Sequence, residues 1–475
     1  MLTYALPQLK ENKFVKALNA FYRSEWYIAL IVVLMTLSEL FAFELPFYYG
    51  TILFVGLNVL FADDALGLVP LICCSYMTVA RVNNPIMNPE VSILRDPAVL
   101  TQIVVVACID AALLIARLVF SIVHNRNRTV PKLSLGFLSV GVFYVLGGVF
   151  SPYFSGLNAA TGLLQIASLC AFYFFLYYTV DWKRVPHDYI FTLFFAVGTG
   201  IACEILGMYL NDGVFREDTV TRNFLYTGWG TYNTVGCVMA MMMPAPFYFA
   251  VKSARHGWAY SVVGVLFMLC VFFTQSRGSI IFGSFVFVLC VAFVLIVAKG
   301  KQKIYHFAVF AVSALGLALA LSVFREEVDK IFGSLVGVGL NPSGRLEIFK
   351  ESWRRFCNYP MFGIGWLGTE PGGDGPLDVY YSHNTVLQLL MTGGILLFLA
   401  YIYHRLQTLE LLFRHPTVEK TVVALCVCSL LATCMLDCHI FSFGPGVLYS
   451  VLLVFAECAQ PIKKPFRPKK VTEIQ

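Results

Sequence analysis

Residues 278–298 read GSIIFGSFVFVLCVAFVLIVA and contain no charged side chain. A helix rises by about 1.5 Å per residue, so a block of this length crosses the roughly 30 Å hydrocarbon core of a membrane. Similar blocks recur along the chain of 475 residues, of which 58% are hydrophobic and 13% are charged. The sequence therefore predicts an all-α, polytopic helical membrane protein.

The apolar blocks predict about fourteen transmembrane helices, with ends placed to within a few residues. An even number of spans puts both termini on the same side of the membrane. The predicted spans are residues 25–43, 46–62, 65–81, 98–123, 134–151, 158–180, 189–210, 231–251, 258–275, 278–298, 305–323, 384–403, 420–436 and 439–458.

Basic residues are concentrated on alternate loops of this topology. They cluster in segment 1–24, in every second short loop and in the tail after residue 458. Because positive charge accumulates on cytoplasmic loops, both termini are predicted to be cytoplasmic. The net charge of +6 follows from this asymmetry and does not indicate a nucleic-acid partner. The one large loop, residues 324–383, is then extracytoplasmic.

Loop 324–383 is the long polar interval of the chain. Within it, Asn341 followed by Pro342 is typical of a helix start, and Pro360 marks the end of that helix. An apolar stripe at helical spacing lies between them. Its members are Leu346, Phe349, Trp353 and Phe356. The pattern predicts a short helix on the membrane surface, followed by a flexible glycine-rich lid.

Four arginines that this topology places outside could bind an anion. Arg277 and Arg345 each lie at the start of a predicted helix, where backbone N–H groups and a guanidinium can converge on a phosphate. The alternatives are that Arg277 reaches lipid headgroups and that Arg345 lies on a solvated helix face. Arg216 and Arg222 follow the seventh span, and a solvated loop is the alternative for both.

His383 begins the twelfth span. An imidazole titrates near neutral pH and can accept a proton from a hydroxyl group. The alternative is a boundary residue without a chemical role. Asp110 lies in the middle of a span, where a charge is costly and commonly functional or paired. Asp437 lies near the outer boundary and is interpreted as an interfacial residue.

The sequence predicts neither a metal nor a cofactor. The fourteen cysteines lie mostly in apolar runs, without a CxxC pair or zinc-ligand spacing. No Walker A loop or GxGxxG element is present. The acidic pair Asp63 and Asp64 falls on the cytoplasmic side of the predicted topology, away from the arginines.

The order of several short motifs resembles the bacterial O-antigen ligase and O-antigen polymerase family. The motifs are Ser276-Arg277-Gly278, Ser343-Gly344-Arg345, Pro360-x-x-Gly363-x-Gly365, His383-Asn384 and, upstream, Gly228-Trp229-Gly230 with Asn233. The resemblance is strongest over residues 225–410, which form the core and carry loop 324–383. N-terminal transmembrane helices occupy residues 1–224, and C-terminal helices with a basic cytoplasmic tail occupy residues 411–475.

The resemblance implies a metal-independent glycosyltransferase of the bacterial cytoplasmic membrane, with an active site facing outward. Its donor would be an oligosaccharide or polysaccharide on undecaprenyl pyrophosphate, and its acceptor a glycan or lipid-linked sugar. By motif, Arg277 and Arg345 would hold the pyrophosphate and His383 would be the base or orienting group. Arg216 or Arg222 would supply a further arginine. Ligase and polymerase share these motifs.

A lipid-linked oligosaccharide flippase is the alternative from another class, because fourteen spans suit a transporter. A flippase is expected to have two related halves and short external loops. The sequence has no visible internal repeat, and loop 324–383 is about 60 residues long. These features favour the enzyme.

Overall fold

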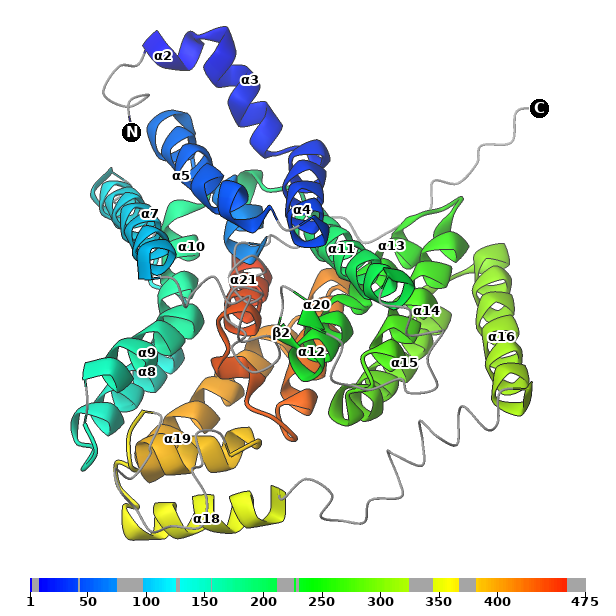
Figure 1. Ribbon diagram of the computed structural model, residues 1–475. Helices are drawn as coiled ribbons and strands as arrows, with labels where there is room; N and C mark the ends of the chain where they lie inside the picture. The colour runs from blue at the N-terminus through cyan, green and yellow to red at the C-terminus, as the bar shows by residue number, and fades with distance from the viewer. Residues whose placement is uncertain are drawn as a thin grey trace.

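The structure is a computed structural model, and helices account for most of the part that it describes (Figure 1). Arg216 and Arg222 lie outside the described residues, as do Asn341, Pro342 and the glycine-rich part of the predicted lid after residue 366. The described residues are Met1, 8–41, 43–74, 97–124, 129–154, 156–211, 226–227, 230–323, 345–366 and 382–458.

Many of the observed helices coincide with predicted spans, whereas the predicted span 65–81 lies partly outside the described residues. The helices are α2 (Gln8–Glu11), α3 (Lys13–Tyr22), α4 (Glu25–Leu40), α5 (Glu44–Phe61), α7 (Pro97–His124), α8 (Ser134–Val149), α9 (Gly156–Ile166), α10 (Phe172–Thr179), α11 (Tyr189–Asn211), α12 (Tyr232–Met242), α13 (Pro244–Lys252), α14 (Gly257–Phe273), α15 (Arg277–Val297), α16 (Gly300–Val323), α18 (Arg345–Asn358), α19 (Thr385–Phe413), α20 (Val418–Thr433) and α21 (Phe443–Cys458). The short elements are a π-helical turn η2 (Ala167–Ala171), two 3-10 turns η3 (Trp182–Arg184) and η5 (His439–Phe441), and an antiparallel pair of strands, β1 (Tyr226–Thr227) and β2 (Gly230–Thr231).

Among the described residues, seven helical segments are long and apolar enough to cross a membrane. The bent pair α3 and α4, with a 70° angle at the break, raises this number to eight. Helices α5, α8, α14 and α21 are apolar but shorter. The predicted class, a helical membrane protein, is confirmed, and the count of fourteen spans stays a prediction.

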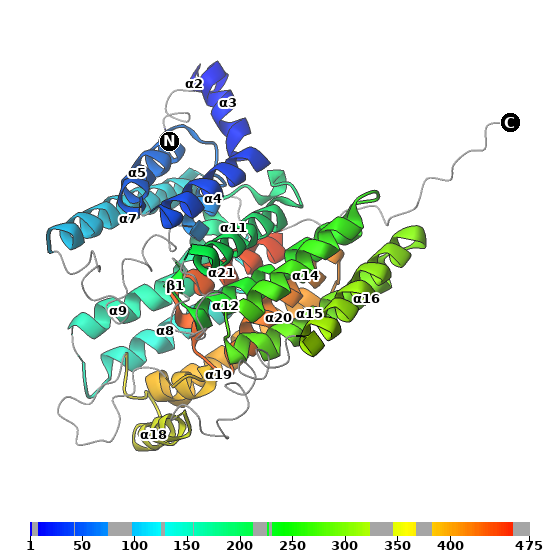
Figure 2. The ribbon, with the colours of Figure 1, turned by 45° about the vertical axis from the view of Figure 1, so that its right-hand side comes forward.

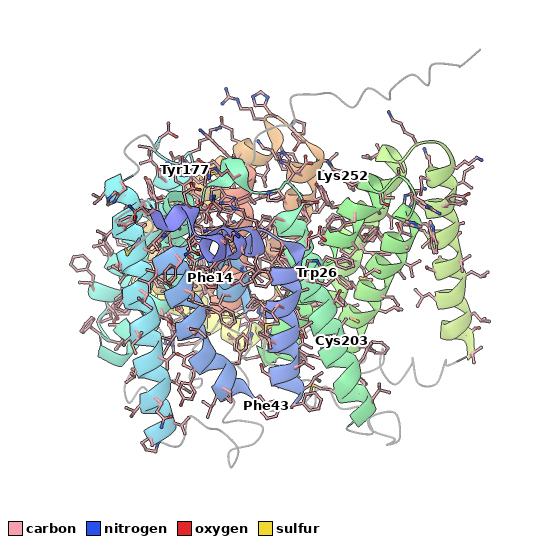
Figure 3. All side chains as sticks on the ribbon, turned by 90° about the horizontal axis from the view of Figure 1, so that it is seen from above. Phe14, Trp26, Phe43, Tyr177, Cys203 and Lys252 are labelled. Carbon is pink, nitrogen blue, oxygen red and sulfur yellow. The ribbon has the colours of Figure 1, made fainter. Side chains whose placement is uncertain are left out.

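The helices differ sharply in how deeply they are packed. The continuous segment of α12 and α13 is 83% buried and lies near the middle of the bundle, whereas α7 is 11% and α16 is 6% buried (Figure 1). Large apolar side chains such as Phe14, Trp26 and Phe43 are exposed on the outer surface (Figure 3). An apolar surface of this extent is suited to contact with lipid rather than water.

Contacts join segments that the charge pattern assigns to the same side of the membrane. Arg23 forms an ion pair with Asp64 at 2.6 Å and donates a hydrogen bond to the carbonyl of Arg184. At the same predicted side, Lys252 pairs with Glu419 at 2.8 Å. The alternation of helix directions is therefore consistent with the predicted topology, and the choice of which side is cytoplasmic rests on the charge pattern.

Helix α19 extends ten residues beyond the predicted end at 403 and is broken at Gly394, whose φ of 68° and ψ of −163° are not helical. Segment 360–365 lies against this break. The N–H of Ile395 donates to the carbonyl of Pro360 at 2.8 Å. In return, the carbonyl groups of Met391 and Thr392 accept from Ile364 at 2.7 Å and Gly365 at 3.0 Å. The PxxGxG motif therefore supplies hydrogen bonds that the broken helix cannot make internally.

We expect Gly363→Ala to lower the melting temperature of the purified protein. Gly363 has a φ of 67°, and a Cβ there would lie 2.4 Å from the carbonyl oxygen of Met391. Backbone strain alone costs about 1–3 kcal/mol at such a position. The matched control is Gly316→Ala in α16, where a Cβ would meet nothing within 4 Å. Equal melting temperatures for the two variants would contradict this account of the motif.

Candidate active site

The candidate site lies where the starts of α15, α18 and α19 meet the connection between α20 and α21. Residues 434–442 form that connection. The N–H of Thr385, at the start of α19, donates to the carbonyl of Cys434 at 3.0 Å, and its hydroxyl donates to the carbonyl of Asp437 at 3.2 Å. These bonds hold the first turn of α19 against the connection. Figure 2 shows α18 beside α19 at one end of the bundle.

His383 is held in an uncommon backbone conformation immediately before α19. Its φ is 46°, in the left-handed region. The next residue, Asn384, caps the helix by accepting a hydrogen bond from the N–H of Leu387 at 3.1 Å, and its side-chain amide donates to the carbonyl of Met435 at 2.8 Å. The imidazole of His383 remains partly exposed, at 36% of the side chain. A substrate hydroxyl group can therefore reach it.

Asp437 is the acidic partner of His383. One carboxylate oxygen lies 3.2 Å from Nδ1 of His383, and the other lies 3.7 Å from Nε2 of His439. Burial opposes its charge, but His439, His383 and the N–H of Cys438 together hold the pKa of Asp437 well below its ordinary value. An ionised carboxylate is thus available to orient the imidazole of His383, leaving Nε2 free to accept a proton.

The sequence analysis interprets Asp437 as an interfacial residue near the outer boundary. The structure adds that its carboxylate is the direct partner of the His383 imidazole. His439 was missed altogether. Its place two residues after Asp437, between two apolar spans, was the available indication of a shared site.

Arg345 is the first residue of α18, and its Nη1 donates to the carbonyl of Leu436 at 2.8 Å. This bond anchors the guanidinium group on Leu436, the residue immediately before Asp437. On the other side of His383, the hydroxyl of Ser382 lies 3.0 Å from that of Ser352 in α18. Helix α18 is therefore tied to both halves of the site. Arg345 and His383 are both anchored on segment 434–438, Arg345 on the carbonyl of Leu436 and His383 on the carboxylate of Asp437.

The start of α15 completes the site. Ser276 caps this helix, and its hydroxyl oxygen lies 3.0 Å from Oδ1 of Asn233 and 3.0 Å from the hydroxyl of Ser279. Arg277 is the first residue of α15 and is half-buried. The N-terminal end of a helix carries unpaired N–H groups and a positive partial charge, which favour an anion.

A small polar pocket joins these elements, with a volume of about 10 Å³. That is roughly the space that one ordered water needs, and far less than the roughly 300–1,000 Å³ of pockets that enclose whole small molecules. The lining residues are Asn233, Ser276, Gly278, Ser279, Arg345, Thr433, Leu436, Asp437 and His439. Arg277 precedes a lining residue in the chain but does not itself line the pocket.

Other predicted residues lie outside this cluster. Asp110 of α7 accepts a hydrogen bond from Thr51 of α5 at 2.7 Å, which ties two N-terminal helices together. Arg216 and Arg222 lie outside the described residues, so their roles stay predictions. Gly230 has a φ of 103° in the hairpin of β1 and β2, a conformation that favours glycine.

Within the described ranges, no group of three or more His, Cys, Asp and Glu side chains could hold a metal ion. All fourteen cysteines lie in the described residues, and each is a free thiol. Independence from metal stays a prediction of the sequence.

The fold and the site define a multi-pass helical membrane protein with a histidine–carboxylate pair next to an arginine-lined pocket. Residues 262–402 match the family model for O-antigen ligase, which supports assignment of the chain to the O-antigen ligase family. The matched segment contains Arg277, Arg345 and His383, whereas Asp437 and Asn233 lie outside it. No curated protein matches the chain.

Proposed function

We propose that the protein is a membrane glycosyltransferase that moves an undecaprenyl-pyrophosphate-linked glycan onto a glycan or lipid-linked sugar outside the bacterial cytoplasmic membrane. The observation that carries this proposal is the pair of His383 and Asp437, held beside Arg345 on a single connecting segment. The family match supports a glycan-transferring activity. The contacts of His383 and Arg345 with segment 436–437 support a base and an anion site at the same place.

In the proposed reaction, the acceptor hydroxyl oxygen attacks the anomeric carbon of the donor sugar. The bond from that carbon to the pyrophosphate oxygen breaks, and its electron pair leaves with the lipid pyrophosphate. Nε2 of His383 takes the hydroxyl proton, while Asp437 accepts a hydrogen bond from Nδ1 and stabilises the imidazolium that forms. Asp437 is thus a positioning residue.

Negative charge on the leaving pyrophosphate grows toward the transition state. The guanidinium of Arg345 and the start of α15 would stabilise this charge without reorganising, because both are already fixed in the fold. Arg277 would add a second guanidinium at the same helix end. These cations would take the part that a divalent metal plays in other pyrophosphate-releasing enzymes.

A reconstituted transfer assay tests the proposal. The purified protein in liposomes would receive a lipid-pyrophosphate-linked oligosaccharide and an acceptor, in excess chelator. We expect the glycan product and free undecaprenyl pyrophosphate to form in equal amounts, with the chelator leaving the rate unchanged. Loss of activity that magnesium or manganese restores would contradict metal independence.

The same assay separates the alternatives. Movement of the donor between leaflets without transfer would identify a flippase and overturn the enzyme proposal. Use of the donor itself as the acceptor would identify a polymerase, and transfer only to a different glycolipid would identify a ligase. His383→Ala serves as the inactive control.

A further inference from the structure

Helix α18 turns its polar side toward the protein. Glu351 and Arg355 are 8% and 3% exposed, and Ser352 is fully buried. The carboxylate of Glu351 accepts hydrogen bonds from Arg354 at 2.6 and 2.8 Å and from Arg355 at 2.8 Å. Hydrogen bonds from Arg354, and then from Arg355, lower the pKa of Glu351 to about 2 despite its burial. Glu351 therefore centres an ionic network that joins the buried Arg355 to Arg354 at the rim of this face.

The apolar stripe of α18 lies on another side of the helix, where Phe349 and Phe356 are half-buried and the other two members are exposed. Leu346 is 47% and Trp353 is 52% exposed, and Met361, just beyond the helix, is 53% exposed. A helix on a water-exposed surface normally turns its apolar stripe toward the protein core. The periodicity in the sequence correctly indicates an amphipathic helix that ends at Asn358, but the structure shows that its apolar side faces away from the core.

The exposed stripe continues onto the end of α8 as one aromatic band. We define the aromatic band as Phe150, Tyr153, Trp353, Phe356, Tyr359 and Phe362. Three separate ring contacts lie along it. Trp353 and Phe356 pack within α18 at a centroid distance of 5.2 Å, and two contacts join the segment after α18 to the end of α8, Tyr359 with Tyr153 at 6.3 Å and Phe362 with Phe150 at 4.9 Å. Beside it, Val149 and Phe154 are also exposed. Aromatic residues gather at the boundary between membrane and water.

We propose that the aromatic band seats α18 in the membrane interface, with the lipids of the adjacent leaflet as its occupant. The band is continuous with the apolar end of α8, a helix of the membrane domain, so lipid covers both parts at once. A protein partner seated on α18 alone would leave the α8 part uncovered. Figure 1 shows α18 lying along the edge of the bundle below α19.

The position of α18 in the membrane interface also affects the proposed reaction. This step of the inference rests on the proposed function. Arg345 lies at one end of α18, two turns from Trp353. A helix fixed in the interface therefore holds that guanidinium at the depth of lipid headgroups, where the pyrophosphate of a lipid-linked donor also lies. The contact of α18 with lipid thus sets the depth of the anion site.

Photo-crosslinking tests the lipid contact without relying on activity. A benzoylphenylalanine placed at Trp353 keeps an aromatic side chain there, and the matched control places it at Glu347, about 120° around the same helix. Both proteins would be irradiated in liposomes of phosphatidylethanolamine and phosphatidylglycerol and analysed by mass spectrometry. We expect lipid adducts at position 353 to exceed those at 347 by at least about fivefold.

Equal lipid adducts at the two positions would overturn the proposal. So would a crosslink from position 353 to a second copy of the chain or to another protein in place of lipid. Neither result would touch the proposed function, which the transfer assay tests separately.

In a second arm, we expect Trp353→Glu to raise KM for the lipid-linked donor with little change in kcat. A lower kcat with an unchanged KM would contradict the proposed role of α18 in setting the depth of Arg345 in the membrane interface.

Discussion

His383→Ala is expected to lower the transfer rate by roughly 10²–10⁴, the range for loss of a general base, while donor affinity stays near its original value. The imidazole acts on the acceptor hydroxyl group, whereas the donor pyrophosphate is held by other groups. Single-turnover transfer and donor binding, measured on purified protein, separate these two effects. The amount of folded protein in the membrane must first be matched between the variants.

Two further variants sharpen the test of His383. His415→Ala removes an exposed histidine from the connection between α19 and α20, and we expect it to leave transfer unchanged. Asp437→Asn keeps the shape of the side chain but removes the charge that orients Nδ1 of His383. We expect it to slow transfer without changing donor affinity. Near-normal turnover of His383→Ala would exclude a catalytic role and leave the boundary-residue interpretation.

Local sequence patterns predict much of the fold because membrane helices are specified by length and hydropathy. The predicted span 278–298 corresponds to α15, which runs from Arg277 to Val297. Pro360 is predicted to end the loop helix, and α18 does end two residues before it, at Asn358. Likewise, Asn384 caps α19, as its place before an apolar run indicates.

The partnership between His383 and Asp437 could not be predicted in this way. The two residues are 54 positions apart, and their contact depends on how α19, α20 and α21 pack. Helical periodicity specifies which residues share a face of one helix but not which helices become neighbours. The motif comparison also stops at residue 402, before the segment that carries Asp437.

The glycine-rich motif shows a different limit. Gly363 and Gly365 were interpreted as part of a flexible lid, and the structure contradicts this for segment 360–365, which is bonded to the break at Gly394. A glycine indicates a position where a Cβ is unfavourable, either because the backbone moves or because another segment approaches it closely. Only the position of α19 reveals that close approach is the reason here.

Arg345→Ala is expected to weaken donor binding and slow transfer together, at a cost of about 2–4 kcal/mol in transition-state stabilisation, by analogy with the loss of one oxyanion donor. Arg345 lines the small polar pocket from the start of α18. In the proposed reaction its contacts with the pyrophosphate should strengthen as charge develops on the leaving group. Arg277→Ala should act in the same direction, because that side chain belongs to the adjacent helix end.

Arg345→Lys separates charge from geometry at this position. Lysine keeps the positive charge but cannot form two parallel hydrogen bonds to a phosphate, so we expect only partial recovery of kcat/KM. The control is Lys350→Ala, which removes an exposed cation from the same helix and should leave transfer unchanged. Loss of activity in Arg345→Ala with unaltered donor affinity and a lowered melting temperature would instead indicate that Arg345 only supports the carbonyl of Leu436. The opposite pattern, weaker donor binding in a stable protein, would place Arg345 on the pyrophosphate and leave His383 to act on the acceptor.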